Sequence, residues 1–307
     1  MSFKFSTEKV LVNTIDNDDH FRISKNIITP ELIASIENYG LLERPVLIRR
    51  GERCYPFTGH NRIKVISGTD AKEIDVFILE SPSSELFFRN TILKVYRKEC
   101  GPVGRLKAVK IMHDDFGLAG SELSDFARKR LKIPNEFISD SGAAESVLSF
   151  PPALKDYIDQ KDITYKIIRD IISSGNEVIA VLNKWLEQTP IRVNIFKMLV
   201  DYLFDIVKRD GGLVKAGCDD FSFIDDKELH DFIFRVRYPE YASKREYAEK
   251  IISTIEKHGV SVDFPEYFEK DKILLRFNIT KKDGGSKLAE LVSELNMESI
   301  DELFELL

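Results

Sequence analysis

The sequence predicts a multidomain α+β protein with an N-terminal α/β domain, an all-helical middle and a small C-terminal α+β domain. The chain has 307 residues, more than one ordinary hydrophobic core accommodates. Short helix and strand patterns alternate in the first part of the chain, a helical period follows, and mixed patterns return near the end. We therefore predict three domains, at residues 1–80, 81–210 and 211–307.

Composition indicates a folded, globular chain. Hydrophobic residues make up 43% and charged residues 31% of the sequence, which is typical of globular domains and not of disordered ones. No apolar run approaches the roughly 20 residues that cross a bilayer, and the N-terminus lacks a signal-peptide pattern. The three cysteines are far apart and the histidines are not clustered. We therefore expect a cytoplasmic protein without a disulfide framework, a metal site or a membrane partner.

The N-terminal domain is predicted from short elements with clear boundaries. Thr29 can cap a helix, Pro30 suits its first position, and Gly40 can end it in a left-handed conformation. Four further elements follow, namely strands at 45–48, 54–57 and 73–79 and a helix at 61–66.

The rest of the chain is read in the same way. Helices are predicted at about 82–98, after Gly101-Pro102, at 121–131, after Pro151-Pro152, from Ile163-Thr164 and from Pro190 to about 208. Beyond Gly211-Gly212, alternating patterns predict strands at 231–236 and 272–277, and helical patterns return at 245–258 and 288–295.

One short stretch carries a chemical signal. A strand ends at Thr58, Gly59 follows, and a helix begins with His60, Asn61 and Arg62. Such a turn directs free backbone N–H groups and the positive end of the helix dipole at one point, and the arginine adds a charged donor. The pattern suits a phosphate group. From these residues alone, however, a structural turn with a solvent-exposed arginine is the favoured interpretation, because a strand-glycine-helix turn with a nearby arginine is common.

The order of several motifs resembles the ParB-like domain of the ParB and sulfiredoxin superfamily. The motifs occur in sequence over positions 10 to 80, at 21–23, 31–36, 40–48 and 59–62. The region from Ser149 to Thr164 is similar, more loosely, to the helix that follows in ParB. Segments 237–239 and 265–269 resemble the C-terminal region of a less studied ParB-like branch.

The resemblance implies a function. ParB domains bind CTP with magnesium, and a helix-turn-helix that follows them in the sequence binds DNA. Nucleotide binding closes the homodimer into a clamp around the DNA. The family's phosphate-binding turn reads Gly-Glu-Arg-Arg, so His60 and Asn61 depart from it and leave the identity of the nucleotide open. The residues that match the family's nucleotide-binding positions are Gly59, His60, Asn61, Arg62, Lys64 and Arg97.

The family's third motif is incomplete here. It has an asparagine, an arginine three residues later and a glutamate further along. In the family, these residues contact the triphosphate and its magnesium ion. Lys94 and Arg97 give the best match, so only the arginine is retained, and an alignment on Asn90 leaves the arginine unmatched. Magnesium prefers oxygen ligands, commonly carboxylates. We therefore expect nucleotide binding without metal-assisted CTP hydrolysis.

A basic segment is the candidate DNA contact. The net charge of the chain is −6, whereas residues 89–132 carry +6 and the remainder −12. The predicted phosphate contacts are Arg128, Lys129, Arg130 and Lys132, at the end of a short helix. Cations also complement the negative end of a helix, so a solvated helix end is the alternative. The following segment, 134–140, is acidic and poor in side chains that read base edges.

Three functions follow from these observations. The first is a DNA-associated partition or regulatory protein, a homodimer with a degenerate helix-turn-helix, switched by CTP or another nucleotide. The second is an enzyme on the same fold, such as a phosphotransferase, nucleotidase or nuclease. The third is a phosphate-ligand sensor that does not bind DNA.

Overall fold

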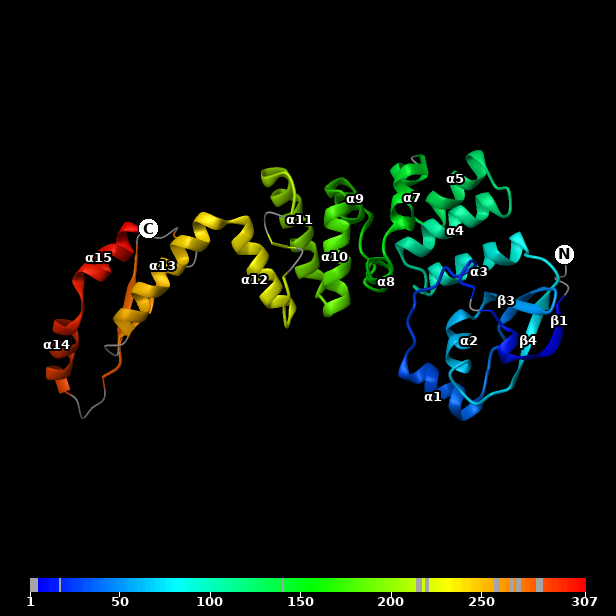
Figure 1. Cartoon of the computed structure of the whole chain (residues 1–307), viewed down its shortest axis with the longest axis horizontal. Helices are drawn as coiled ribbons and strands as arrows, with labels where there is room; N and C mark the ends of the chain where they lie inside the picture. Colours follow the sequence, from blue (N-terminus) through cyan, green and yellow to red (C-terminus); the bar gives the residue numbers. More distant parts are fainter. Residues whose placement is uncertain are drawn as a thin grey trace. The chain divides into compact units, whose positions relative to one another are not determined.

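The structure is a computed structural model of the chain (Figure 1). It describes residues 5–16, 18–139, 141–213, 217–218, 221–256, 260–265, 268, 272–279 and 284–307. The chain divides into two compact units, Met1–Leu229 and His230–Leu307. The predicted boundary at residue 80 falls inside the first unit, and the predicted boundary at residue 210 falls before its end.

A four-stranded sheet forms the N-terminal part of the first unit, in the order β1-β4-β2-β3. Its strands are β1 (Ser6–Leu11), β2 (Val46–Arg50), β3 (Arg53–Thr58) and β4 (Glu73–Leu79). The central pair β2–β4 is parallel and the other pairs are antiparallel. The three predicted strands are confirmed. Strand β1 was not predicted, because Val10 is its only buried residue and no hydrophobic alternation marks it.

Two helices, α1 (Pro30–Tyr39) and α2 (His60–Ile66), pack on one face of this sheet. As the sequence predicts, the Thr29 hydroxyl accepts a hydrogen bond from the Leu32 amide (3.2 Å), and Gly40 ends α1 with φ 70°. Strand β4 supplies alternate residues to the shared core, which consists of Val10, Ile36, Leu47, Cys54, Ile63, Val65, Ile66, Ile74, Val76 and Ile78. Burying this apolar surface orders the start of α2.

An aromatic cluster joins the sheet to helix α3 (Ser84–Tyr96). Phe57 of β3 lies 6.1 Å from Phe87 of α3, and Phe21 lies 4.9 Å from Phe57, measured between ring centroids. The ring of Phe116 packs 5.6 Å from Phe87. Phe21, Phe57 and Phe87 are almost wholly buried. The Phe57–Phe87 pair is T-shaped and the other two are tilted, and such ring pairs add to the hydrophobic stabilisation of burial. They therefore hold α3 beside the sheet.

Helices account for the rest of the first unit, and the described residues of 81–210 contain no strand. The predicted all-helical middle is therefore confirmed. The helices are α3, α4 (Pro102–Asp114), α5 (Gly120–Lys129), α6 (Asn135–Ser139), α7 (Ser141–Ser149), α8 (Pro152–Gln160), α9 (Tyr165–Ser174), α10 (Asn176–Gln188) and α11 (Val193–Asp210).

The N-terminus of α4 is capped from a distant helix. The Asp159 carboxylate on α8 accepts hydrogen bonds from the amides of Val103 (2.7 Å) and Gly104 (3.2 Å). Burial raises the pKa of this carboxyl to about 6, although the two amides act in the opposite direction. The contact fixes α4 and α8 together, with the chain around Ile23 packed against Gly104.

The second unit is a small α+β assembly. It contains α13 (Pro239–Glu256), β5 (Val260–Asp263), β6 (Leu274–Phe277), α14 (Gly284–Glu294) and α15 (Met297–Glu305). Strands β5 and β6 pair antiparallel, and the core includes Ile251, Ile255, Val260, Ile300 and Leu303. The strand predicted at 272–277 and the helices predicted at 245–258 and 288–295 correspond to β6, α13 and α14, although residues 257–258 lie outside the described part.

The strand predicted at 231–236 is wrong, because this segment lies in helix α12 (Asp226–Arg237). The Asp225 carboxylate accepts hydrogen bonds from the amides of Lys227 (3.0 Å) and Glu228 (2.9 Å), which caps the helix. Leu229 and Ile233, one turn apart, are fully buried. Capping and helical burial therefore prevail over the β-propensity of the aromatic and branched residues.

Adding a methyl group at Gly104 should destabilise the first unit. A Cβ there would overlap the Ile23 carbonyl oxygen, so α4 or the segment around Ile23 must move. We expect G104A to lower the free energy of unfolding by about 1–3 kcal/mol, the usual cost of adding a methyl group to a well-packed core. Urea denaturation followed by circular dichroism measures the change. G68A is the control, since a Cβ at Gly68 meets nothing closer than 3.4 Å, and an equal loss of stability in both variants would contradict the prediction.

Candidate functional site

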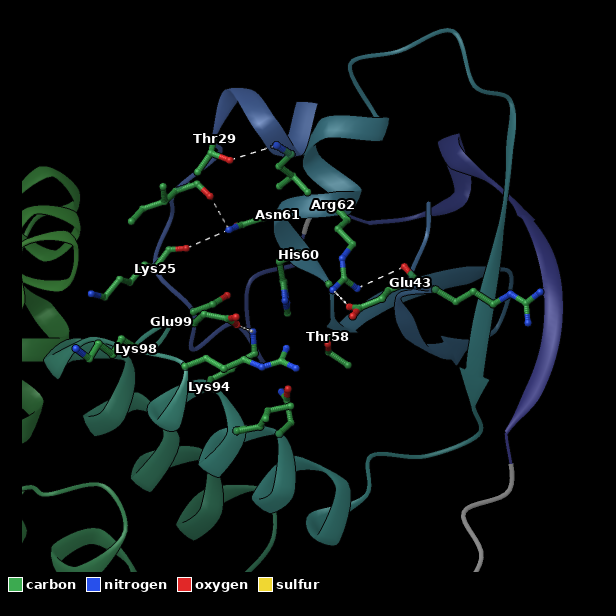
Figure 2. Close-up of a pocket in the computed structure, with 18 residues that line it drawn as sticks. Lys25, Thr29, Glu43, Thr58, His60, Asn61, Arg62, Lys94, Lys98 and Glu99 are labelled. Carbon is green, nitrogen blue, oxygen red and sulfur yellow. Dashed lines mark hydrogen bonds and ion pairs between the residues drawn. The ribbon is translucent and has the colours of Figure 1, made fainter. Parts of the chain in front are cut away.

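A cavity of about 570 Å³ lies in the first unit, between the start of α2 and the end of α3 (Figure 2). Four segments line it, from residues 24–32, 43–44, 58–62 and 90–99. The sheet positions the third segment, and the aromatic cluster positions α3 opposite. The predicted turn therefore opens into a real cavity and not onto a flat surface.

Positive charge dominates the lining. The cationic residues are Lys25, Arg44, Arg62, Lys94, Arg97 and Lys98, whereas Glu43 and Glu99 are the acidic ones. Both acids are ion-paired within the cavity, Glu43 with Arg62 and Glu99 with Lys94 (3.9 Å). The Lys25 ammonium pairs with Asp162 (2.6 Å) and the Arg44 guanidinium lies over the Phe77 ring, both outside the lining. The other four cations still outnumber the two carboxylates, so the cavity has a net positive charge and attracts anions.

The predicted succession of strand, glycine and helix is present at Gly59, between β3 and α2. Gly59 has φ 86°, a left-handed backbone that favours glycine, and an added Cβ would lie 2.9 Å from the Cβ of Pro45. The Arg62 Nη1 atom lies 3.8 Å from that Cβ position, so the guanidinium folds back over its own turn. Figure 2 shows Arg62 directed at Glu43, whose carbonyl oxygen accepts a hydrogen bond from Nη1 (3.4 Å).

Asn61 holds the cavity wall in place. Its Nδ2 donates to the carbonyl oxygens of Lys25 (3.2 Å) and Ile27 (2.9 Å), and its Oδ1 accepts from Arg22 (3.3 Å). The side-chain amide is therefore fully engaged with protein groups. Asn61 lies in the site as predicted, where its contacts position the segment around Lys25.

His60 is buried at the bottom of the site, with 8% of its surface exposed. Burial lowers its pKa to about 3, helped by the positive charges of Lys94, Arg22 and Lys107, so the ring is neutral at pH 7. The Pro56 backbone acts in the opposite direction, more weakly. Nε2 is buried and has no partner among the described residues.

One face of α3 and its C-cap contribute three polar residues, because Asn90, Lys94 and the capping Arg97 follow one another at intervals of one helical turn. The Asn90 Nδ2 atom is buried and has no partner in the described part of the chain. Burial lowers the pKa of Lys94, and the nearby Glu99 opposes this effect. Both alignments of the third family motif, on Asn90 and on Lys94, therefore lead to the same cavity.

Lys98 has an unusual backbone for a side chain with a Cβ. Its φ of 59° is left-handed, and the amides of Lys98 and Glu99 bond back to the carbonyls of Val95 (3.1 Å) and Lys94 (2.8 Å). This is a Schellman ending for α3, in which glycine is the usual residue. The turn places Lys98 in the cavity lining.

The structure brings together five of the six predicted nucleotide-binding residues. Lys64 is the exception, since it is exposed and lines a smaller neighbouring cavity of about 220 Å³ with Asp18, Asp19 and Arg22. Sequence reasoning missed Lys25, Arg44 and Lys98 as part of the site. No local motif marks these three, which only the fold places beside the Gly59 turn.

The predicted DNA contacts lie at and beyond the end of α5. Arg128 and Lys129 both pair with Asp125, at 2.7 and 2.6 Å, whereas Arg130 and Lys132 are exposed. Helices α6 and α7 follow, where the resemblance places a recognition helix. No basic residue occurs between positions 133 and 154, so these helices lack the cations that grip DNA.

Other site types find no support in the described part of the chain. It contains no cluster of three or more His, Cys, Asp or Glu side chains that could hold a metal ion. The three cysteines are buried and unbridged. No described helix combines the length and apolar character needed to cross a bilayer.

No family model and no curated protein matches the chain. Solved structures that overlap it include two of the C-terminally truncated chromosome-partitioning protein ParB from Caulobacter crescentus. One, complexed to the centromeric parS site, is 11% identical with a TM-score of 0.30, over 59% of this chain and 91% of that one. The other, complexed with CTP-gamma-S, is 13% identical with a TM-score of 0.26, over 59% and 99%. Since these TM-scores are low, the ParB resemblance continues to rest on the N-terminal motifs.

The buried ring of His60 should make stability depend on pH. Its pKa is about 3 in the folded chain and near 6.5 when unfolded, so the unfolded state takes up the proton first as pH falls. The quantity of interest is the free energy of unfolding of the wild type minus that of H60N. We expect this difference to decrease as the pH falls below 6.5, by on the order of 1 kcal/mol per pH unit. Urea titrations between pH 7 and pH 5 measure this difference. H113N is the control for losing an exposed histidine, and a flat difference for H60N would contradict the prediction.

Proposed function

We propose that this chain is a ParB-like, DNA-associated regulatory protein that binds a nucleotide in the cavity beside Gly59 and Arg62. The observation that carries the proposal is that lysine and arginine residues from four separate segments line one cavity, where Arg62, Lys94, Arg97 and Lys98 outnumber the two carboxylates. Ordinary surface lysines and arginines are spread apart, because like charges repel. Their convergence here is explained by an anionic ligand.

Two features favour a nucleotide over inorganic phosphate. The volume of about 570 Å³ lies within the roughly 300–1,000 Å³ of small-molecule sites, whereas a phosphate ion needs far less. Two lining residues, Asn90 and His60, also each hold a polar atom that is buried and has no partner in the described part of the chain. A small movement of these side chains toward the cavity would let them bond neutral polar groups such as those of a sugar or a base. CTP is the first candidate, because it is the ligand that the ParB resemblance implies.

The ligand is proposed as a switch and not as a substrate. Magnesium, which the resemblance implies, prefers carboxylate and phosphate oxygens. The lining has only the carboxylates of Glu43 and Glu99, and both face cations. These residues do not fit a magnesium site of the ParB type, and we assign no hydrolytic step. No observation favours a phosphotransferase, nucleotidase or nuclease.

DNA contact is proposed through phosphates alone. Arg130 and Lys132 are exposed beyond α5, and helices α6 and α7, which follow directly, carry no basic residue to read base edges. Contact of this kind is independent of sequence and sensitive to salt. A homodimer remains part of the proposal, on the ParB resemblance only.

Nucleotide binding should raise the melting temperature of the wild type. A ligand that binds only the folded state stabilises it by about 2.7 kcal/mol at one hundred times its Kd. We expect CTP to give a clear shift without magnesium and R62A to reduce it strongly, since the variant lacks a charge-assisted donor. Differential scanning fluorimetry with CTP, ATP, GTP, UTP and phosphate measures the shift.

The control for this experiment is R89A, on the same helix as Asn90. Arg89 pairs with Glu85 (2.6 Å) and does not line the cavity. R89A should therefore keep the wild-type shift. If neither nucleotides nor phosphate stabilise the wild type, the cavity does not bind the proposed ligand. A phosphate shift equal to that of CTP would support the phosphate sensor instead.

DNA binding should weaken when the exposed cations beyond α5 are removed. The slope of log K against log salt falls by about one unit for every phosphate-binding cation that is removed, so R130A/K132A should lower the slope by about two. Fluorescence anisotropy with an unrelated 30-base-pair duplex, at several salt concentrations, measures it. K184A/K197A removes two exposed charges from α10 and α11 as the control. An equal decrease in both variants would show that the cations beyond α5 have no particular role in DNA binding.

A further inference from the structure

Lys25 joins three parts of the first unit. Its amide donates to the Glu99 carbonyl at the end of α3 (2.8 Å), and its own carbonyl accepts from Asn61 at the start of α2 (3.2 Å). Its ammonium forms an ion pair with Asp162 at 2.6 Å. Two of these contacts are therefore with the cavity lining, and the third is with a corner between α8 and α9.

The ammonium of Lys25 is held away from the cavity. Figure 2 shows the side chain extending away from Arg62, although Lys25 itself belongs to the lining. Its residue surface is only 8% exposed, whereas the Asp162 side chain is 51% exposed. A buried ammonium needs a partner, because an unpaired buried charge is costly. Asp162 supplies that partner.

The corner at Asp162 is itself unusual. Asp162 has φ 49°, a left-handed conformation that is uncommon outside glycine. The preceding helix, α8, also contacts the segment around Lys25 through Asp156, which accepts from Asn26 (3.4 Å). Asn26 does not line the cavity. Asp162 and Asp156 thus both contact this segment, and of these two only Asp162 pairs with a cavity cation. Burial raises the pKa of the Asp159 carboxyl that caps α4, and the positive charge of Lys25 acts in the opposite direction.

We propose that the cavity and the α8–α9 corner compete for the Lys25 ammonium, so that ligand binding releases Asp162. This coupling rests on the proposed nucleotide site and describes its regulation. The flexible four-carbon stem of lysine lets the ammonium serve an anion in the cavity or Asp162, but not both at full strength. Because coupling free energies are reciprocal, loosening the corner must also tighten ligand binding. In this scheme Lys25 binds the ligand directly, through its ammonium.

Substitution at Asp162 tests the coupling through CTP affinity, measured by isothermal titration calorimetry on the full chain. Asparagine tolerates the left-handed backbone, so D162N removes the charge without straining the corner. We expect D162N to bind CTP about two- to fivefold more tightly. This is the change in affinity that corresponds to the free energy of a partly exposed ion pair. K25M should bind more weakly, and K25M/D162N should match K25M. D156N is the matched control and should bind as wild type does.

A second measurement uses the wild type alone. Hydrogen exchange of the amides at Asp162 and Ile163 should quicken when CTP is added, because the corner loses its ion pair. Equal CTP affinities for D162N and D156N would overturn the coupling, as would a K25M/D162N variant that keeps the gain of D162N. If CTP binds wild type and not R62A while D162N is unchanged, only the coupling fails. If CTP binds no variant, the proposed site fails together with it.

Discussion

The packing of Phe57 against Phe87, with Phe21 beside both, is the contact on which the rest of the first unit depends. It fixes α3 against the sheet on the side opposite the core that α1 and α2 share. Asn61 then bonds the segment around Lys25 to the start of α2. The cavity is the space left between these fixed elements. Its shape therefore comes from ordinary hydrophobic packing, and its chemistry from a few polar side chains at the edges.

The clustered positive charge in this cavity lowers the stability of the unliganded chain. Lysine and arginine side chains that face one another repel, and burial lowers the pKa of Lys94 further. Glu43 and Glu99 offset part of this repulsion through their ion pairs. His60 adds a buried ring that stays neutral. An anion that enters relieves the remaining repulsion, so folding stability and ligand binding are linked.

Much of this architecture could be predicted from the sequence, because short-range signals decide it. The Thr29 cap, the Gly40 end of α1 and the strand-to-helix turn at Gly59 each depend on residues that are close together in the sequence. The edge strand β1 could not be predicted, since pairing with β4 is a long-range event and only Val10 is buried. Residues 231–236 were mistaken for a strand because tertiary packing prevails over local propensity. Lys25 and Lys98 could not be assigned to the site either, because only the tertiary structure places them beside the Gly59 turn.

Lys98 illustrates how backbone shape and electrostatics oppose each other in this protein. A left-handed backbone costs a residue with a Cβ roughly 1–2 kcal/mol more than it costs glycine. Glycine at this position would relax the end of α3 and, in the same step, delete one of the cavity cations. Selection for heat resistance and selection for ligand affinity would therefore favour different residues at this one position.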